Sequence, residues 1–341
     1  MGRATRHMAA ILLALACAPS DSPAWTTDEH RVLADSALGT VLVNLGAADS
    51  MRVRQTLQQA EPGPASSALD ALGFGAIAAR SARNEHSPAR YHPRYRSLLE
   101  ELEGLTAARL DSAWSEEALP KPGRLAAGPR HGGQNPGRLR ARNVAVGYLE
   151  QHVIALRFAR RAGEQQAFAA GANASGIELR PDDAATLLRA ALIHEAFAQG
   201  FLADAFVSRH LMPPMGFRLA ALHPVNRNRY EDYYSHQGLY VLNARGETWQ
   251  TFGDKLLLWY GPSFAHVFEA CTTSLRELLL TWTVAVGGEP RESLAAWADS
   301  VARARGTTPA KMVAAWCTSH EGPAYLAELR MPALMLIPTP V

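Results

Sequence analysis

One segment constrains the fold more than any other. Residues 190–206 read AALIHEAFAQGFLADAF and are apolar on nearly every side of a helix. Pro181 predicts the start of this helix, which extends toward Arg209 and would be about 40 Å long at about 1.5 Å per residue. A helix that is apolar all round is normally surrounded by other protein. We therefore expect further helices to pack around it, as in a large all-α domain.

Helical periodicity also runs through most of the remaining chain. Helices are expected after Thr27 as N-cap, over about residues 143–162, and from Pro309 at a first helical position. After Pro262, apolar side chains recur at steps of three and four, which predicts a buried stripe that ends at Gly287. The stripe consists of Phe264, Phe268, Cys271, Leu275, Leu278, Trp282 and Ala285.

Composition and the remaining patterns favour a single multi-helix domain over residues 25–341. The chain has 341 residues, of which 48% are hydrophobic, so it can bury a sizeable core. Its net charge of +2 argues against a dedicated nucleic-acid-binding surface. Only residues 238–243, which a turn signal follows, favour a strand. Residues 119–142 hold five Gly, four Pro, six basic residues and no acid. They predict either a solvated loop or a basic flap over an anionic substrate.

The N-terminus is typical of an exported protein. Residues 1–24 combine a basic start, a short apolar region and the small-x-small sequence Ser-Pro-Ala at residues 22–24, which predicts a cleaved signal peptide. Cleavage there makes Trp25 the first mature residue of a periplasmic or secreted protein. The alternative is a lipoprotein anchored at Cys17. No later segment is long and apolar enough to predict a transmembrane helix.

The mature chain would keep two cysteines, Cys271 and Cys317. Thiols in an oxidising compartment commonly pair, so we expect a disulfide between them.

Two groups of residues are candidates for a metal site. A free Trp25 amine and the carbonyl of the same residue could chelate a metal, and His30 follows about one helical turn later. Asp204 lies in an apolar surround, and a buried carboxylate needs a cation, hydrogen bonds or a metal. His210 can fold back toward Asp204 if the helix ends near Arg209, and a carboxylate bridging two zinc ions would suit that arrangement. The alternative is an ion-paired Asp204 and a His210 at a helix C-terminus.

Two further histidines have an acidic neighbour in sequence. Asp232 and His236 are four residues apart, so on a helix they would share a face and could bind one metal or each other. His194 and Glu195 begin like a metalloprotease motif, but the second histidine is absent because residue 198 is alanine. His194 is therefore expected to be a hydrogen-bonded core histidine.

These segments resemble a known enzyme superfamily. Trp25 to His30 (WTTDEH) resembles the mature start of the zinc-dependent phospholipases C and fungal single-strand nucleases, and residues 201–210 (FLADAFVSRH) resemble their Asp-to-His zinc segment. The resemblance implies an α-helical domain with a zinc cluster that cleaves phosphodiester bonds in phospholipids or nucleic acids. With a phospholipid substrate, peripheral membrane contact is expected.

The sequence also departs from the pattern of that superfamily. Gly200 stands where a histidine ligand is expected, and Arg209 replaces a glycine. No histidine has an acid four residues later, so Asp232 and His236 are the nearest substitute. One or two zinc ions are therefore expected instead of three. Two functions follow: an exported zinc-dependent phosphodiester hydrolase, or a catalytically degenerate relative that binds lipid or a protein partner.

Overall fold

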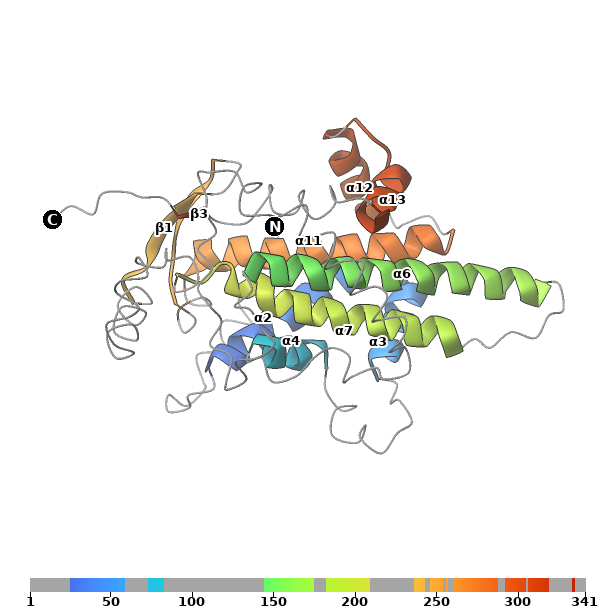
Figure 1. Cartoon of the computed structure of the whole chain (residues 1–341), viewed down its shortest axis with the longest axis horizontal. Coiled ribbons are helices and arrows are strands. Elements are labelled where there is room, and N and C mark those ends of the chain that lie inside the picture. The colour runs from blue at the N-terminus through green and yellow to red at the C-terminus, as the bar shows by residue number, and fades with distance from the viewer. Residues whose placement is uncertain are drawn as a thin grey trace, which may run out of the picture.

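Three long helices lie side by side at the centre of the molecule (Figure 1): α6 (Val144–Ala174), α7 (Asp182–Asp204) and α11 (Gly261–Ala285). In this computed structural model, α7 runs antiparallel to α6 and α11. The structure describes residues 25–58, 73–82, 144–174, 182–208, 236–242, 246–253, 256, 260–287, 292–304, 306–318 and 333–334. These residues are mostly helical, which confirms the predicted all-α class.

Helix α7 occupies the centre, as its apolar sequence predicts. Nearly all its side chains from residue 187 onward are buried, and it contacts α6, α11, α2, α3 and α4. The helix ends at Asp204, five residues earlier than the sequence suggested. Residues 205–208 continue as a buried turn, in which the N–H of Val207 donates to the carbonyl oxygen of Asp204 at 3.1 Å. Asp204 is therefore the last helical residue.

Helices α2 (Trp25–Val43), α3 (Ala47–Gln58) and α4 (Phe74–Ala82) pack around the core. The first of them begins at Trp25, so Thr27 is inside the helix and the predicted N-cap is wrong. Helices α2 and α4 approach closely at Gly75. Its N–H donates to the Asp35 carboxylate at 2.7 Å, and an added Cβ would lie 2.3 Å from the carbonyl oxygen of Arg31.

Helix α11 carries the predicted apolar stripe. Cys271, Leu275, Leu278 and Trp282 are fully or almost fully buried, while the two phenylalanines and Ala285 at the ends of the stripe are partly exposed. Gly287 follows the last turn with a φ of +75°, a conformation that glycine adopts without strain. The periodicity and the predicted end of this helix are thus confirmed.

Cys271 carries a free, buried thiol, so the predicted disulfide to Cys317 is wrong. Cys271 lies in the third turn of α11 beside Gln199 of α7, whose amide donates to the Cys271 carbonyl oxygen at 3.1 Å. Cys317 is near the end of α13 (Pro309–Thr318), which packs with α12 (Glu292–Ala304) against the bundle. Burial raises the pKa of the Cys271 thiol, which keeps it protonated.

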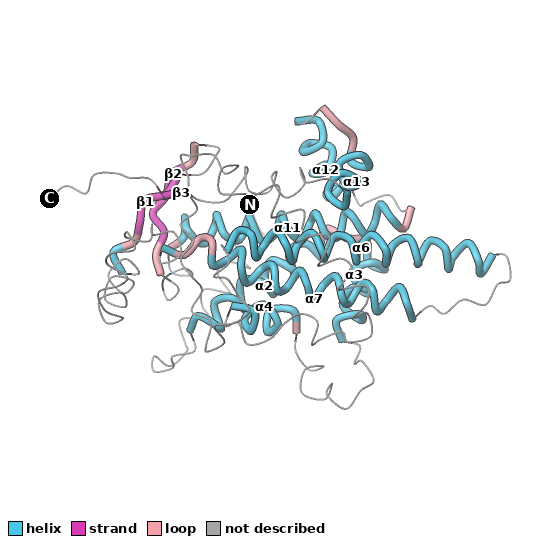
Figure 2. The backbone as a smooth tube through the Cα atoms, in the orientation of Figure 1, coloured by secondary structure: helices cyan, strands magenta, loops and turns pink. Residues whose placement is uncertain are grey.

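A small antiparallel sheet lies at the end of the bundle where α7 ends and α11 begins (Figure 2). Its strands are β1 (Leu239–Leu242), β2 (Thr248–Thr251) and β3 (Ala333–Leu334), in the order β2-β1-β3. The predicted strand at residues 238–243 is confirmed as β1. The other two strands were not predicted.

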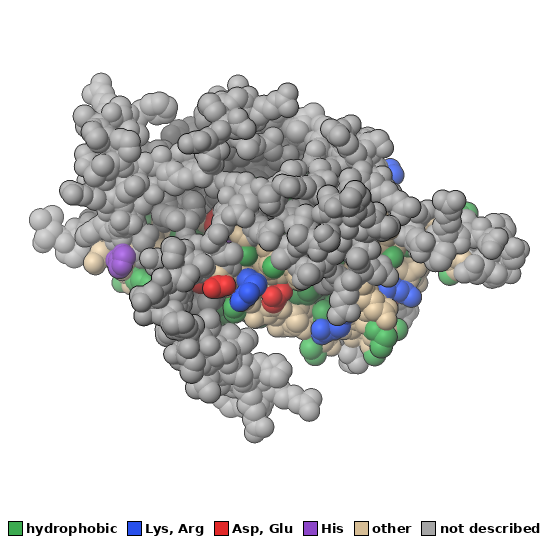
Figure 3. Space-filling model, turned by 90° about the horizontal axis from the view of Figure 1, so that it is seen from below, with side chains coloured by type: hydrophobic (Ala, Val, Ile, Leu, Met, Phe, Trp, Pro, Cys, Tyr) green, Lys and Arg blue, Asp and Glu red, His purple; other side chains and the backbone are tan. Residues whose placement is uncertain are grey.

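Near the middle of the face seen in Figure 3, acidic and basic side chains of the described residues lie next to one another. Two of the exposed pairs are Arg31 with Asp28 and Arg52 with Asp49, at 3.4 and 3.9 Å. Among the helices that the structure describes, none is both long and apolar enough to cross a membrane. The basic segment 119–142 lies outside the described residues.

Candidate functional site

The structure brings together two of the predicted site residues, His30 and Asp204. Nε2 of His30 in α2 lies 3.2 Å from Oδ1 of Asp204 at the end of α7. Both side chains are nearly inaccessible, with 5% and 2% of their surface exposed. Glu29, the neighbour of His30, is also buried. Two ionisable groups from distant parts of the sequence therefore meet in a place that water scarcely reaches.

The spacing and chemistry of this pair fit a zinc ion. Two ligands that bind one tetrahedral zinc at about 2.0–2.1 Å are about 3.3–3.4 Å apart. The observed 3.2 Å is close to that separation, and imidazole nitrogen and carboxylate oxygen are both zinc donors. The same contact is also a satisfactory ion pair without a metal. The geometry is thus compatible with either state, and a metal role for the pair stays a prediction.

The other predicted ligands are only partly within the described residues. Trp25 is the first residue of α2, about 7.5 Å along the axis from His30 at about 1.5 Å per residue. His210 and Asp232 lie outside the described residues, and His236 is helical and exposed, three residues before β1. Within the described ranges, no three His, Cys, Asp or Glu side chains form a group that could hold a metal.

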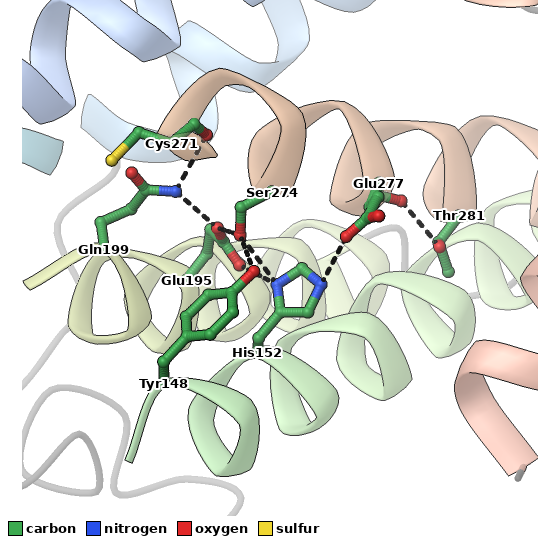
Figure 4. Close-up of polar contacts among 8 residues, drawn as sticks. All are labelled: Tyr148, His152, Glu195, Gln199, Cys271, Ser274, Glu277 and Thr281. Atoms are coloured by element: carbon green, nitrogen blue, oxygen red, sulfur yellow. Dashed lines mark hydrogen bonds and ion pairs between the residues drawn. The ribbon is translucent and has the colours of Figure 1, made fainter. Parts of the chain in front are cut away.

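A second polar cluster lies deeper in the bundle, where α6, α7 and α11 meet (Figure 4). At its centre is His152, a residue that the sequence patterns did not single out. Its Nδ1 lies 2.7 Å from Oε2 of Glu195, and its Nε2 lies 3.1 Å from Oε2 of Glu277. All three side chains are buried. One imidazole ring therefore links two carboxylates from different helices.

Hydrogen bonds extend this cluster. The Tyr148 hydroxyl donates to Oγ of Ser274 at 2.9 Å, and the Ser274 hydroxyl donates to Oε1 of Glu195 at 2.6 Å. The amide of Gln199 donates to the same Glu195 oxygen at 2.8 Å. We name these residues the core network: Tyr148, His152, Glu195, Gln199, Ser274 and Glu277.

The core network resembles a nucleophile with its base, but the details exclude that role. Oγ of Ser274 lies 3.1 Å from Nδ1 of His152, which is within reach for proton transfer. However, the Ser274 proton points to Glu195, and the Nδ1 position is shared with that same carboxylate. Because these side chains have essentially no exposed surface, a substrate has no access to them. The network joins three helices and is not an active site.

The charges of the network explain the ionisation of His152. Burial alone would lower the pKa of this imidazole, because it disfavours the charged form. The charges of Glu195 and Glu277 and the hydrogen bonds to them outweigh burial and raise the pKa to about 9. Burial, together with the same two carboxylates, raises the pKa of the Tyr148 hydroxyl. At neutral pH, His152 is therefore protonated.

His194 is a core histidine, as the sequence predicted. It is fully buried, its Nδ1 lies 2.8 Å from Oε1 of Gln151, and its ring stacks on Phe158 with 5.5 Å between centroids. Its neighbour Glu195 belongs to the core network.

The comparisons with known proteins leave the family open. No protein-family model matches the chain, and neither the curated proteins nor the solved structures gave a significant match.

Proposed function

We propose that the protein is an exported, zinc-dependent phosphodiester hydrolase of the phospholipase C and single-strand nuclease type. The observation that carries the proposal is the buried contact between His30 and Asp204. These two residues come from the two segments whose sequences resemble that superfamily. The start of α2 at Trp25, the residue that the predicted cleavage would expose, is a second support.

In this proposal, His30 and Asp204 hold one zinc ion together with the Trp25 amine. Asp204 bridges to a second ion, for which His210, Asp232 and His236 are the remaining candidates. Zinc bound there would polarise a phosphoryl oxygen and lower the pKa of a bound water. The burial of the Asp204 side chain would strengthen its interaction with a bound cation, because charges interact more strongly in a medium of low dielectric constant. Phospholipids and nucleic acids are the two candidate substrates.

The runner-up is a catalytically degenerate scaffold of the same fold that binds lipid or a protein partner. The observation that favours it is Gly200, which lies one helical turn before Asp204 in α7 and has no side chain to donate. The Asp204 carboxylate also already has a partner in His30, at 3.2 Å. A protein that has lost its metals could keep this pair as an ordinary ion pair.

Zinc content and hydrolysis separate the two proposals. We expect the mature wild type to hold at least about one zinc per chain and to cleave a chromogenic phosphodiester. Changes beside a metal site commonly cost about 10–100-fold in affinity, so Asp204→Asn should lose zinc and activity at least to that extent.

The matched control is His194→Gln, which changes another buried histidine partner on α7 and should retain both zinc and activity. A folded wild type that holds no zinc after supplementation and hydrolyses nothing would support the scaffold instead. Loss of zinc in the control would show that the metal site has been placed wrongly.

A further inference from the structure

The turn after Asp204 is hydrogen-bonded to the small sheet and packs against it. The Thr251 hydroxyl in β2 donates to the carbonyl oxygen of Phe206, and the N–H of Ser208 donates to the carbonyl oxygen of Phe252 at 3.0 Å. The Phe206 ring stacks on Trp249 of the same strand, with 6.2 Å between centroids. The residues directly after Asp204 are therefore held by Trp249 and Thr251 of one strand and by Phe252 at its end.

The same part of β2 also contacts the segment that follows His236. Leu239 pairs with Thr251, and the Gln250 amide donates to the carbonyl oxygen of Gln237 at 2.8 Å. Gly238 allows the two backbones to approach closely here because it has no side chain. A Cβ at that position would lie 2.8 Å from the carbonyl oxygen of Thr251. The backbone just after His236 therefore lies directly against β2.

The Ser208 N–H and Gly238 contact the end of β2 on opposite edges of the strand. Successive carbonyl groups of a strand point to opposite sides. Because the carbonyl of Thr251 lies beside Gly238, the carbonyl of Phe252, which binds Ser208, points away from β1. The end of β2 thus lies between Ser208 and the segment that follows His236, while the side chains of Thr251 and Trp249 hold Phe206 on one face of the strand.

Thr251 is the only residue among those described whose side chain ties β2 to the carbonyl oxygen of Phe206. It is fully buried, and its Oγ1 also lies 3.3 Å from Oγ of Ser263 at the start of α11. Water cannot readily replace a hydroxyl in such a place. The orientation of the turn at residues 205–208 therefore depends on this side chain.

We propose that β2 sets the distance between the two ligand-bearing segments, and that Thr251 is the positioning residue that holds the Asp204 side. This inference rests on the proposed zinc site and adds to it. Thr251 touches neither metal nor substrate. It acts through the backbone of residues 205–208, whose Val207 N–H binds the Asp204 carbonyl oxygen.

The test compares Thr251→Val, Thr251→Ser and Ser263→Ala by zinc affinity, measured by competition with a chelator. Valine keeps the size of threonine and removes the hydroxyl, so zinc should bind about 10–100-fold more weakly. Serine keeps the hydroxyl and should bind zinc within about threefold of wild type. Ser263→Ala removes the other neighbour of the hydroxyl and leaves the contact to Phe206, so its zinc affinity should equal that of wild type.

A purely structural role would lower the melting temperature of Thr251→Val and of Ser263→Ala without changing the zinc affinity of the folded protein. That result would overturn the inference. So would a Thr251→Ser variant that is as impaired as Thr251→Val.

A second readout keeps the inference separate from the proposed function. Hydrogen exchange of the Val207 and Ser208 amides is measured in zinc-free wild type and zinc-free Thr251→Val. Faster exchange in the variant supports positioning by Thr251, and unchanged exchange overturns it. If the wild type binds no zinc but these amides respond, the proposed function fails while the mechanical role of β2 stands.

Discussion

At the scale of single residues, the core network is the feature that most affects how stability depends on pH. His152 has a folded pKa of about 9, against an ordinary value of 6.5, so the folded protein binds its proton more tightly than the unfolded chain does. The resulting stabilisation is complete below about pH 6.5 and is lost as the pH rises through about 9. Cys271 and Tyr148 also have raised pKa values and add a loss of the same sign at higher pH.

We therefore expect the free energy of unfolding to fall between pH 6.5 and 9, as measured by urea denaturation in buffers of equal ionic strength. Glu277→Gln removes one of the two carboxylate charges and keeps an oxygen near Nε2 of His152. In this variant the fall should still begin near pH 6.5 but should be smaller and end at lower pH, because the folded pKa of His152 is less elevated while its unfolded pKa is unchanged. A wild-type curve that is flat over this interval would contradict the ion pairing described for His152.

Some of these residues could be predicted from the sequence, and others could not. His194 was correctly predicted as a core histidine because its helix is apolar and its motif is incomplete. His152 was missed because its nearest acidic residue in sequence, Glu150, is two positions away and would not face it on a helix. The available signal was that each buried helix carries polar residues about one turn apart, for instance Glu195 and Gln199 or Ser274 and Glu277. That pattern indicates a buried network, but it does not say which residues meet.

At the scale of elements, the crossing of α6 and α11 depends on a glycine. A Cβ at Gly163 would lie 2.6 Å from both the Ala285 Cβ and the carbonyl oxygen of Trp282. Gly171, further along α6, has open space where a Cβ would be added. Both glycines lie within α6, and they differ in whether other atoms lie close to an added Cβ.

Gly163→Ala should destabilise the protein by about 1–3 kcal/mol, because the helices must move apart. Gly171→Ala should stabilise it by about 0.5–1 kcal/mol, because alanine restricts the unfolded chain and favours helix. Thermal and urea unfolding of the two variants measures both effects. Equal changes in the two variants would show that α6 and α11 are not closely packed at Gly163.

The elements themselves were largely predictable, since periodicity and proline or glycine signals are local. The limits of α11, the start of α13 and the strand β1 all follow from such signals. The end of α7 at Asp204 does not, because the turn that follows it is hydrogen-bonded to Thr251 in a distant strand and to Phe252 just after that strand. β3 has only two residues and is defined by its partner β1, so its own sequence gives little indication of it.

At the scale of the whole molecule, the candidate site is assembled from both halves of the chain. His30 and Asp204 are neighbours only because α2 and the end of α7 pack together. Sequence reasoning could name the two residues through their chemistry and the resemblance of their segments. It could not derive the contact, since no local pattern relates positions so far apart.

Processing of the N-terminus is a whole-molecule prediction, because the proposed site needs a free Trp25 amine. Protein recovered from the exported fraction should begin at Trp25 when its N-terminus is sequenced. A variant that keeps one extra residue before Trp25 should bind zinc more weakly, since its amine is displaced from His30. A lipid-modified mature start at Cys17 would refute this part of the proposal.

The most direct test of the central claim is a crystal of the mature protein grown with zinc and measured at the zinc absorption edge. The anomalous difference map should show a peak about 2.0–2.2 Å from both Nε2 of His30 and an oxygen of Asp204. The Asp204→Asn crystal, prepared identically, should lack that peak. A map of the wild type with no peak at this pair, and with His30 still 3.2 Å from Asp204 as an ion pair, would contradict the account.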